Sequence, residues 1–154
     1  MIRKLLCATL VLGSAAGVLL AADAFTGTWK LDVAKSTFAS DSPAPRELTL
    51  TFTVQGGNLT QTMSGTAAGG SQTNTAWTAP VTGGTVIFPA GQGPNGGATL
   101  AVVDDKTLLM TQNLASPTVG ASRTYQVSAD GKTLTLTQKA IGGQERNRMA
   151  FTRQ

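Results

Sequence analysis

The sequence contains no histidine and a single cysteine, and both shortages limit its chemistry. Without histidine the chain cannot form a Ser-His-Asp triad, and zinc sites lose one of their commonest ligands. Cys7 lies near the N-terminus, in a segment that we expect to be removed. The mature chain would then have no disulfide, no thiol nucleophile and no thiolate metal ligand. We therefore expect no metal and no cofactor.

Charged residues are also scarce, at 13% of the chain, and the carboxylates offer little for catalysis. Asp104, Asp105 and Asp130 fall in predicted turns. A carboxylate pair for glycoside hydrolysis would have to come from Asp32 and Glu47, which are separated by a loop. We predict no catalytic residue, and an enzyme of unknown type is the third choice of function.

Lysine and arginine outnumber aspartate and glutamate by 12 to 8, but the basic residues are scattered along the chain. A nucleic-acid-binding domain usually gathers them on one face, and in single-strand binders aromatic residues lie between them. No such cluster is present in the sequence, so we expect no nucleic acid partner.

The first 24 residues are typical of a secretory signal. Arg3 and Lys4 supply a short positive region, and residues 5–20 form an apolar run broken only by small residues. Ala22-Asp23-Ala24 has the small-x-small pattern that signal peptidase recognises, so Phe25 would begin the mature chain. The run is shorter than the roughly 20 residues that a membrane-spanning helix needs, although an uncleaved anchor is the alternative.

These features predict a signal peptide at residues 1–24 and a single domain at residues 25–154. Cys7 comes too early in the apolar run for a lipoprotein signal. We expect the mature protein to be periplasmic or secreted, with no membrane span.

Apolar and polar residues alternate with a period of two in several places, which predicts half-buried β-strands. The clearest case is Leu48, Leu50 and Phe52, which alternate with threonines. Glycine pairs and Asp130-Gly131 between such runs supply the positive φ angles of tight hairpins. We predict ten strands, at residues 25–32, 47–54, 58–64, 71–78, 84–88, 98–103, 106–113, 120–128, 132–140 and 145–153.

Sequential hairpins of this kind form a meander, which removes its exposed edges best by closing on itself. The predicted fold class is all-β, a closed antiparallel up-and-down barrel of roughly eight to ten strands. A two-sheet β-sandwich is the alternative. The one candidate for helical structure in the mature chain is a single turn near residues 33–38.

The segment Gly91–Gly96 matches the G-x-G-x-x-G pattern of dinucleotide-binding loops. In those loops a strand turns directly into a helix whose N-terminus holds the pyrophosphate. Here Pro94 interrupts the loop, and a strand follows it. We therefore interpret residues 89–97 as a flexible loop.

Arg123 and Tyr125 are two residues apart in a predicted strand and therefore share one face. If that face points inward, they can hold a ligand carboxylate through charge-assisted hydrogen bonds. The alternative places the Arg123 guanidinium in water at the barrel rim, with Tyr125 alone packed. Trp77 and Met110 are further candidates for ligand binding, because a methionine side chain adapts to irregular shapes.

Inward positions offer mostly small and medium side chains, which leave unfilled space in a closed barrel. An apolar cavity of this kind is the default ligand site of such a protein. The leading function is non-catalytic binding of a small apolar or amphipathic molecule inside the exported barrel. The alternative is an envelope or protein-interaction module with a filled barrel.

Residues 25–31, Phe-Thr-Gly-Thr-Trp-Lys-Leu, resemble the start of the calycin barrels, which include the lipocalins and the fatty-acid-binding proteins. Both groups carry Gly-x-Trp on the first strand, and Gly27 and Trp29 match it. The resemblance implies that Trp29 closes one end of the barrel. It also implies that a basic residue of the last strand, here Arg148 or Arg153, packs on the indole ring.

The following residues 32–38 and the proline-rich loop at residues 40–45 are also similar to small exported lipocalin-like proteins of bacteria, whose functions are unassigned. The chain departs from the fatty-acid-binding proteins in two respects. Residues 36–46 are too few for their helix-turn-helix lid, and Arg123 and Tyr125 lie about two strands before the last strand, which carries their Arg-x-Tyr. The resemblance therefore carries over the fold better than any ligand site.

Overall fold

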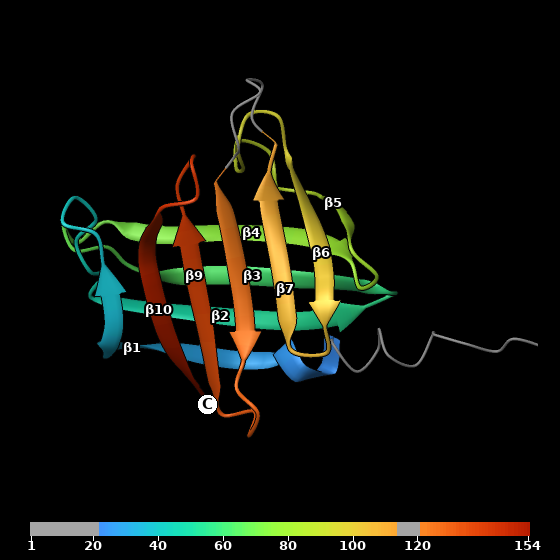
Figure 1. Ribbon diagram of the computed structural model, residues 1–154, viewed down its shortest axis with the longest axis horizontal. Helices are drawn as coiled ribbons and strands as arrows, with labels where there is room; N and C mark the ends of the chain where they lie inside the picture. Colours follow the sequence, from blue (N-terminus) through green and yellow to red (C-terminus); the bar gives the residue numbers. More distant parts are fainter. Residues whose placement is uncertain (1–21, 114–120) are drawn as a thin grey trace, which may run out of the picture.

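A computed structural model describes residues 22–113 and 121–154, and within them the chain forms ten β-strands (Figure 1). The predicted signal segment lies outside this part, apart from residues 22–24. All ten predicted strands are confirmed; most ends differ by one or two residues, β1 runs six residues beyond its predicted end, and residue 120 of the predicted eighth strand lies outside the described residues. They are β1 (Gly27–Phe38), β2 (Glu47–Gln55), β3 (Asn58–Thr66), β4 (Gln72–Pro80), β5 (Gly84–Val86), β6 (Ala98–Asp104), β7 (Thr107–Gln112), β8 (Ser122–Val127), β9 (Thr133–Lys139) and β10 (Glu145–Arg153).

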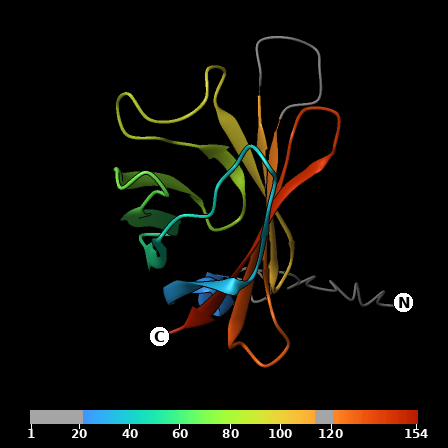
Figure 2. The ribbon, with the colours of Figure 1, turned by 90° about the vertical axis from the view of Figure 1, so that its left-hand side faces the viewer.

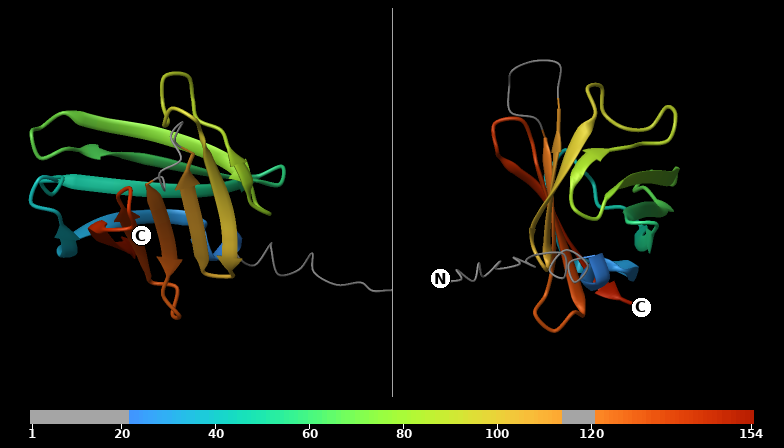
Figure 3. Two further views of the ribbon diagram at one scale, coloured as in Figure 1. Left: turned by 45° about the horizontal axis from the view of Figure 1, so that its top comes forward. Right: turned by 90° about the vertical axis from the view of Figure 1, so that its right-hand side faces the viewer.

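The strands form one antiparallel sheet in the order β4-β3-β2-β1-β10-β9-β8-β7-β6-β5. The two ends of the sheet meet at an isolated bridge between Thr78 of β4 and Ile87, the residue after β5, which exchange N–H···O bonds of 2.9 and 2.8 Å. The sheet is therefore a nearly closed up-and-down barrel, as predicted, and the β-sandwich alternative is wrong. Strands β6–β10 cross in front of β1–β4 (Figure 1), and side views show these two layers facing each other (Figures 2 and 3).

Strand β1 belongs to both layers because it is long and irregular. Its pairing with β10 shifts register between Asp32 and Thr37. Within this irregularity the Ser36 hydroxyl donates to the Asp32 carbonyl at 2.7 Å and accepts from the Ala150 N–H at 3.0 Å. The helical turn suggested for residues 33–38 is wrong: side-chain oxygens satisfy a distorted strand, and no helix forms there.

Alternating side chains fill the barrel. Leu48, Leu50 and Phe52 of β2 are buried, while the threonines between them are half-buried on the outer face. Phe52 lies at the centre of an aromatic cluster, with its ring centroid 5.8 Å from Phe25, 6.2 Å from Trp77 and 5.8 Å from Tyr125. Burial of these large apolar surfaces is the main stabilising contribution to the fold.

One end of the barrel is closed by Trp29. Its indole N–H donates to the Phe25 carbonyl at 2.8 Å, and the Arg153 guanidinium lies 4.2 Å above the ring centroid. Gly27 has a φ of +123°, and a Cβ at this position would lie 3.3 Å from the Arg153 Nη1. The Gly-x-Trp motif therefore leaves room for the arginine. Of the two candidate partners, Arg153 lies on the ring, whereas Arg148 pairs with Glu145 at 3.0 Å.

A short helical turn, residues 22–25, precedes β1 and covers this closed end. In the part of the chain that the structure describes, no helix has the length and apolar character needed to span a membrane.

Candidate functional site

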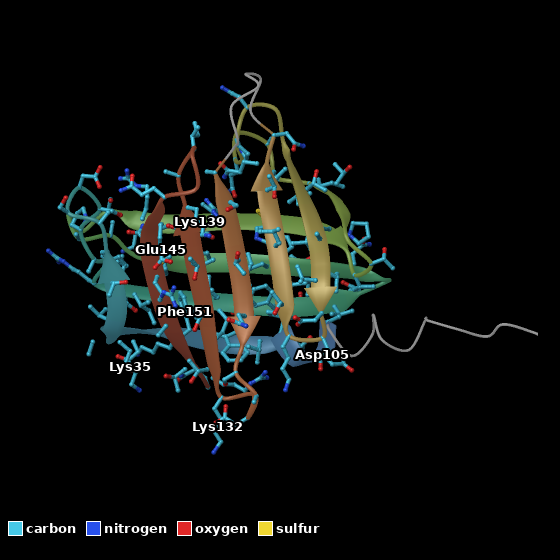
Figure 4. All side chains as sticks on the ribbon, viewed as in Figure 1. Lys35, Asp105, Lys132, Lys139, Glu145 and Phe151 are labelled. Atoms are coloured by element: carbon cyan, nitrogen blue, oxygen red, sulfur yellow. The ribbon has the colours of Figure 1, made fainter. Side chains whose placement is uncertain are left out.

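The opposite end of the barrel is open and holds three cavities. It is the end where β1 joins β2, β3 joins β4, β5 joins β6 and β9 joins β10. Figure 4 shows Lys139 and Glu145 at this end, far from Lys132 at the closed end. Each cavity is lined by residues of several strands that are distant in sequence.

The apolar cavity has a volume of about 290 Å³ and lies between the β1–β2 and β3–β4 connections. Most of its wall is hydrocarbon. Its apolar lining residues are Phe38, Pro43, Pro45, Leu48, Met63, Ala67, Ala68 and Met149. A pocket of this composition favours the apolar part of a small molecule.

The side cavity, of about 220 Å³, lies between β4 and the loop at residues 88–97. Its wall includes Trp77, Phe88 and Arg123. β5 is too short to pair with the whole of β4, and the Gln92 amide oxygen accepts the Ala76 N–H at 2.9 Å instead. The glycine-rich loop thus covers a gap in the barrel wall, and no helix follows it, in agreement with its interpretation as a loop.

The cationic cavity, of about 170 Å³, lies across the open ends of β7 to β10. Arg123, Lys139 and Arg146 line it together with polar side chains, and none of its lining residues is a carboxylate. Asp41 contacts the Arg146 guanidinium at 2.6 Å without lining the cavity. The hydrogen bond from Arg146 lowers the pKa of Asp41 below its usual value, so Asp41 stays ionised in this pair.

The three cavities share walls. Met63 lines both the apolar and the side cavity, and Arg123 lines both the side and the cationic cavity. Gln138 and Asn147 line both the apolar and the cationic cavity. The apolar and the cationic cavity are therefore neighbours, with Gln138 and Asn147 between them.

The structure brings two of the predicted ligand residues, Trp77 and Arg123, to the side cavity. Arg123 lies on the same face as the buried Tyr125 and Val127, so its side chain points inward. It is half-buried and lies nearer the open end than they do. Tyr125 and Met110 are buried in the core and line none of the three cavities. Gly27 and Trp29 lie at the closed end.

Sequence reasoning missed Met63, Gln138 and Asn147. The last two carry a signal in the sequence, because each continues an inward apolar row by one more step. Gln138 follows Leu134 and Leu136 on β9, and Asn147 precedes Met149 on β10. A polar residue at the end of such a row lies at the mouth of a barrel.

A further polar pair lies deeper in the barrel. Gln61 and Trp77 are register partners on β3 and β4, and their exposed fractions are only 3% and 2%. Within the described part of the chain, the Gln61 Nε2 and the Trp77 Nε1 have no hydrogen-bond partner. Sequence reasoning did not select Gln61 as a buried position.

No protein-family model and no curated protein matches the sequence. Solved structures match over most of the chain. A redesigned β-barrel, mFAP1, bound to DFHBI, has a TM-score of 0.50 at 16% identity and covers 86% of this chain and 98% of its own. The REP1-NXSQ fatty acid transporter has a TM-score of 0.50 at 10% identity, covering 84% and 95%.

Rv2717c from M. tuberculosis has a TM-score of 0.52 at 21% identity and covers 89% of this chain and 97% of its own. At these identities the likeness concerns the fold. Together with the meander order and the arginine packed on Trp29, it identifies the fold as a calycin-like β-barrel.

Proposed function

We propose that this protein binds a small apolar or amphipathic molecule, without catalysis, in the cavities at the open end of the barrel. The observation that carries the proposal is the contrast between the two ends. Aromatic side chains and Arg153 fill the closed end, whereas three cavities with shared walls occupy the open end.

The cavity sizes and the neighbouring structures support this proposal. Ligand sites usually measure about 300–1,000 Å³. The apolar cavity alone, at about 290 Å³, approaches the lower limit of this range, and the other two cavities adjoin it. Two barrels of similar fold are described as bound to DFHBI and as a fatty acid transporter, so this architecture accommodates small molecules in those proteins.

Filling the apolar cavity is expected to prevent binding. In Ala68→Trp, an indole would occupy the cavity wall at a half-buried turn position. Titration with the neutral fluorophore N-phenylnaphthylamine should give saturable binding to the wild type. The variant should bind at least about tenfold more weakly, equivalent to about 1.4 kcal/mol.

Ala101→Trp is the matched control, because Ala101 is exposed on the outer face of β6 and should tolerate the indole without affecting binding. Equal binding by wild type and Ala68→Trp would contradict the assigned cavity. If the wild type bound no apolar probe, the filled-barrel interaction module would be favoured instead.

We also propose that the barrel is exported after cleavage between Ala24 and Phe25, on the basis of the Ala22-x-Ala24 site. N-terminal sequencing of protein from the periplasmic or secreted fraction should then begin at Phe25. Intact Met1 in the membrane fraction would contradict cleavage. Cleavage at this site would remove Ala24, whose carbonyl accepts a 2.6 Å hydrogen bond from Arg153. A mature chain that began upstream of Ala24 would keep this hydrogen bond.

A further inference from the structure

The part of β4 nearest the open end has an unpaired edge. In an antiparallel ladder, the N–H and C=O groups of every second residue point to the same side of the strand. Thr78 exchanges both of its bonds with Ile87, so these groups point toward β5. The same groups of Ala76, Asn74 and Gln72 therefore point to that side as well. Across residues 22–113 and 121–154, no strand lies opposite them, because β5 has only three residues.

Among the described residues, these edge groups form one hydrogen bond, from the Ala76 N–H to the Gln92 amide oxygen at 2.9 Å. The Gln92 side chain thus takes the place of a neighbouring backbone. The Ala76 C=O and both backbone groups of Asn74 and Gln72 are left without a partner in the described residues. Sheet edges are usually protected by charged residues, proline or a bulge. Residues 72–76 contain none of these.

The side cavity adjoins this edge. Thr75 and Trp77 line it from β4, and Phe88 and Pro94 line it from the loop across the gap. Thr75 shares the inward face of the buried Trp77, so a residue paired with Thr75 on an added strand would also point inward, into the cavity. The volume of about 220 Å³ accommodates one large apolar side chain. Arg123 also lines the cavity, which disfavours a cationic side chain there.

We propose that the β4 edge binds an extended peptide segment of another protein as an added antiparallel strand, with one uncharged apolar side chain in the side cavity. Main-chain hydrogen bonds then supply the affinity and the cavity selects the side chain, as is usual in strand addition. The antiparallel direction continues the line of β5 beyond Ile87. This inference goes beyond the proposed small-molecule function, because backbone groups of β4, and not the apolar cavity, hold the peptide.

Titration with the peptide acetyl-Thr-Ser-Thr-Leu-Thr-Ser-Thr-amide, followed by amide NMR, tests the edge. The signals of Gln72 and Asn74 should shift in a saturable manner, more than those of Thr73 and Thr75, whose N–H groups face β3. Asn74→Pro removes an edge N–H without removing a bond to β3, a position where a strand tolerates proline. It should weaken peptide binding at least about fivefold. Asn74→Ala is the matched control, since it keeps the N–H and should bind like the wild type.

Two further peptides separate the backbone from the side chain, using the wild-type protein. N-methylation of the two threonines beside leucine removes donors to β4 and should abolish binding. Replacing leucine with serine should weaken binding at least about tenfold, because no apolar side chain then enters the cavity. Gln92→Ala should bind the original peptide about two- to tenfold more tightly, because no side chain competes for the Ala76 N–H.

Four results would each overturn the proposal. They are no peptide binding by the wild type at millimolar peptide, binding that is unaffected by both N-methylation and Asn74→Pro, equal binding of the leucine and serine peptides, and weaker binding by Gln92→Ala. A wild-type dimer in sedimentation equilibrium that Asn74→Pro dissociates would also overturn it, since a second copy would then occupy the edge. Titration with N-phenylnaphthylamine reports the small-molecule function separately, so the failure of either proposal is recognised by itself.

Discussion

Replacing Trp29 with alanine is expected to lower the free energy of unfolding by about 3–5 kcal/mol, the usual cost of removing a large buried aromatic side chain. The Trp29 side chain is fully buried, so the substitution would leave a cavity at the closed end. It would also remove the donor to the Phe25 carbonyl and the ring that supports Arg153.

Urea unfolding followed by circular dichroism measures this loss. Trp29→Phe keeps an aromatic ring but loses the indole N–H, and its cost should fall between those of wild type and Trp29→Ala. A loss below about 1 kcal/mol for Trp29→Ala, the range of an ordinary substitution, would show that Trp29 does not close the barrel.

The second large effect is expected for Arg153→Met, which should lower the free energy of unfolding by about 2–4 kcal/mol, because hydrogen bonds to charged groups and a cation–π contact are lost together. The Arg153 guanidinium donates to the carbonyls of Gly131, Thr26 and Ala24 at 2.8, 2.8 and 2.6 Å. Methionine fills similar space but leaves all three carbonyls without this donor.

Arg148→Met is the matched control, since Arg148 lies on the same strand but forms an exposed pair with Glu145. Exposed ion pairs contribute little to stability, so this variant should unfold close to the wild type. Equal destabilisation by the two substitutions would contradict the specific role of Arg153. The comparison should use a chain that retains Ala24, whose carbonyl is one of the acceptors.

The strands were predictable because each strand of the barrel has one buried and one solvated face, so apolar and polar residues alternate along it. The same alternation also distinguishes the two candidate arginines of β10. Met149 and Phe151 point inward, so Arg153 shares their face and Arg148 does not. The irregularity in β1 was harder to predict, because it depends on the Ser36 hydroxyl, which contacts Asp32 of β1 and Ala150 of β10.

The candidate site was only partly predictable. Trp77 and Arg123 follow from residue type and face, but the cavities depend on how side chains from distant strands meet. Met110 and Met63 look equivalent in the sequence, yet Met110 is fully buried and Met63 lines two cavities. Their difference lies in packing, which the sequence does not show: Met110 is fully buried although it is the register partner of Arg123, whereas Met63 is half-buried.

Methionine methyl NMR tests the central claim, that the open end binds a small molecule, most directly. Met63 and Met149 line the apolar cavity, and Met110 is buried in the core and lines none of the three cavities. Titration with decanoate and with decanol should shift the Met63 and Met149 methyl signals in a saturable manner and affect Met110 much less. Unchanged Met63 and Met149 signals at saturating ligand, or shifts confined to Met110, would contradict binding at the open end.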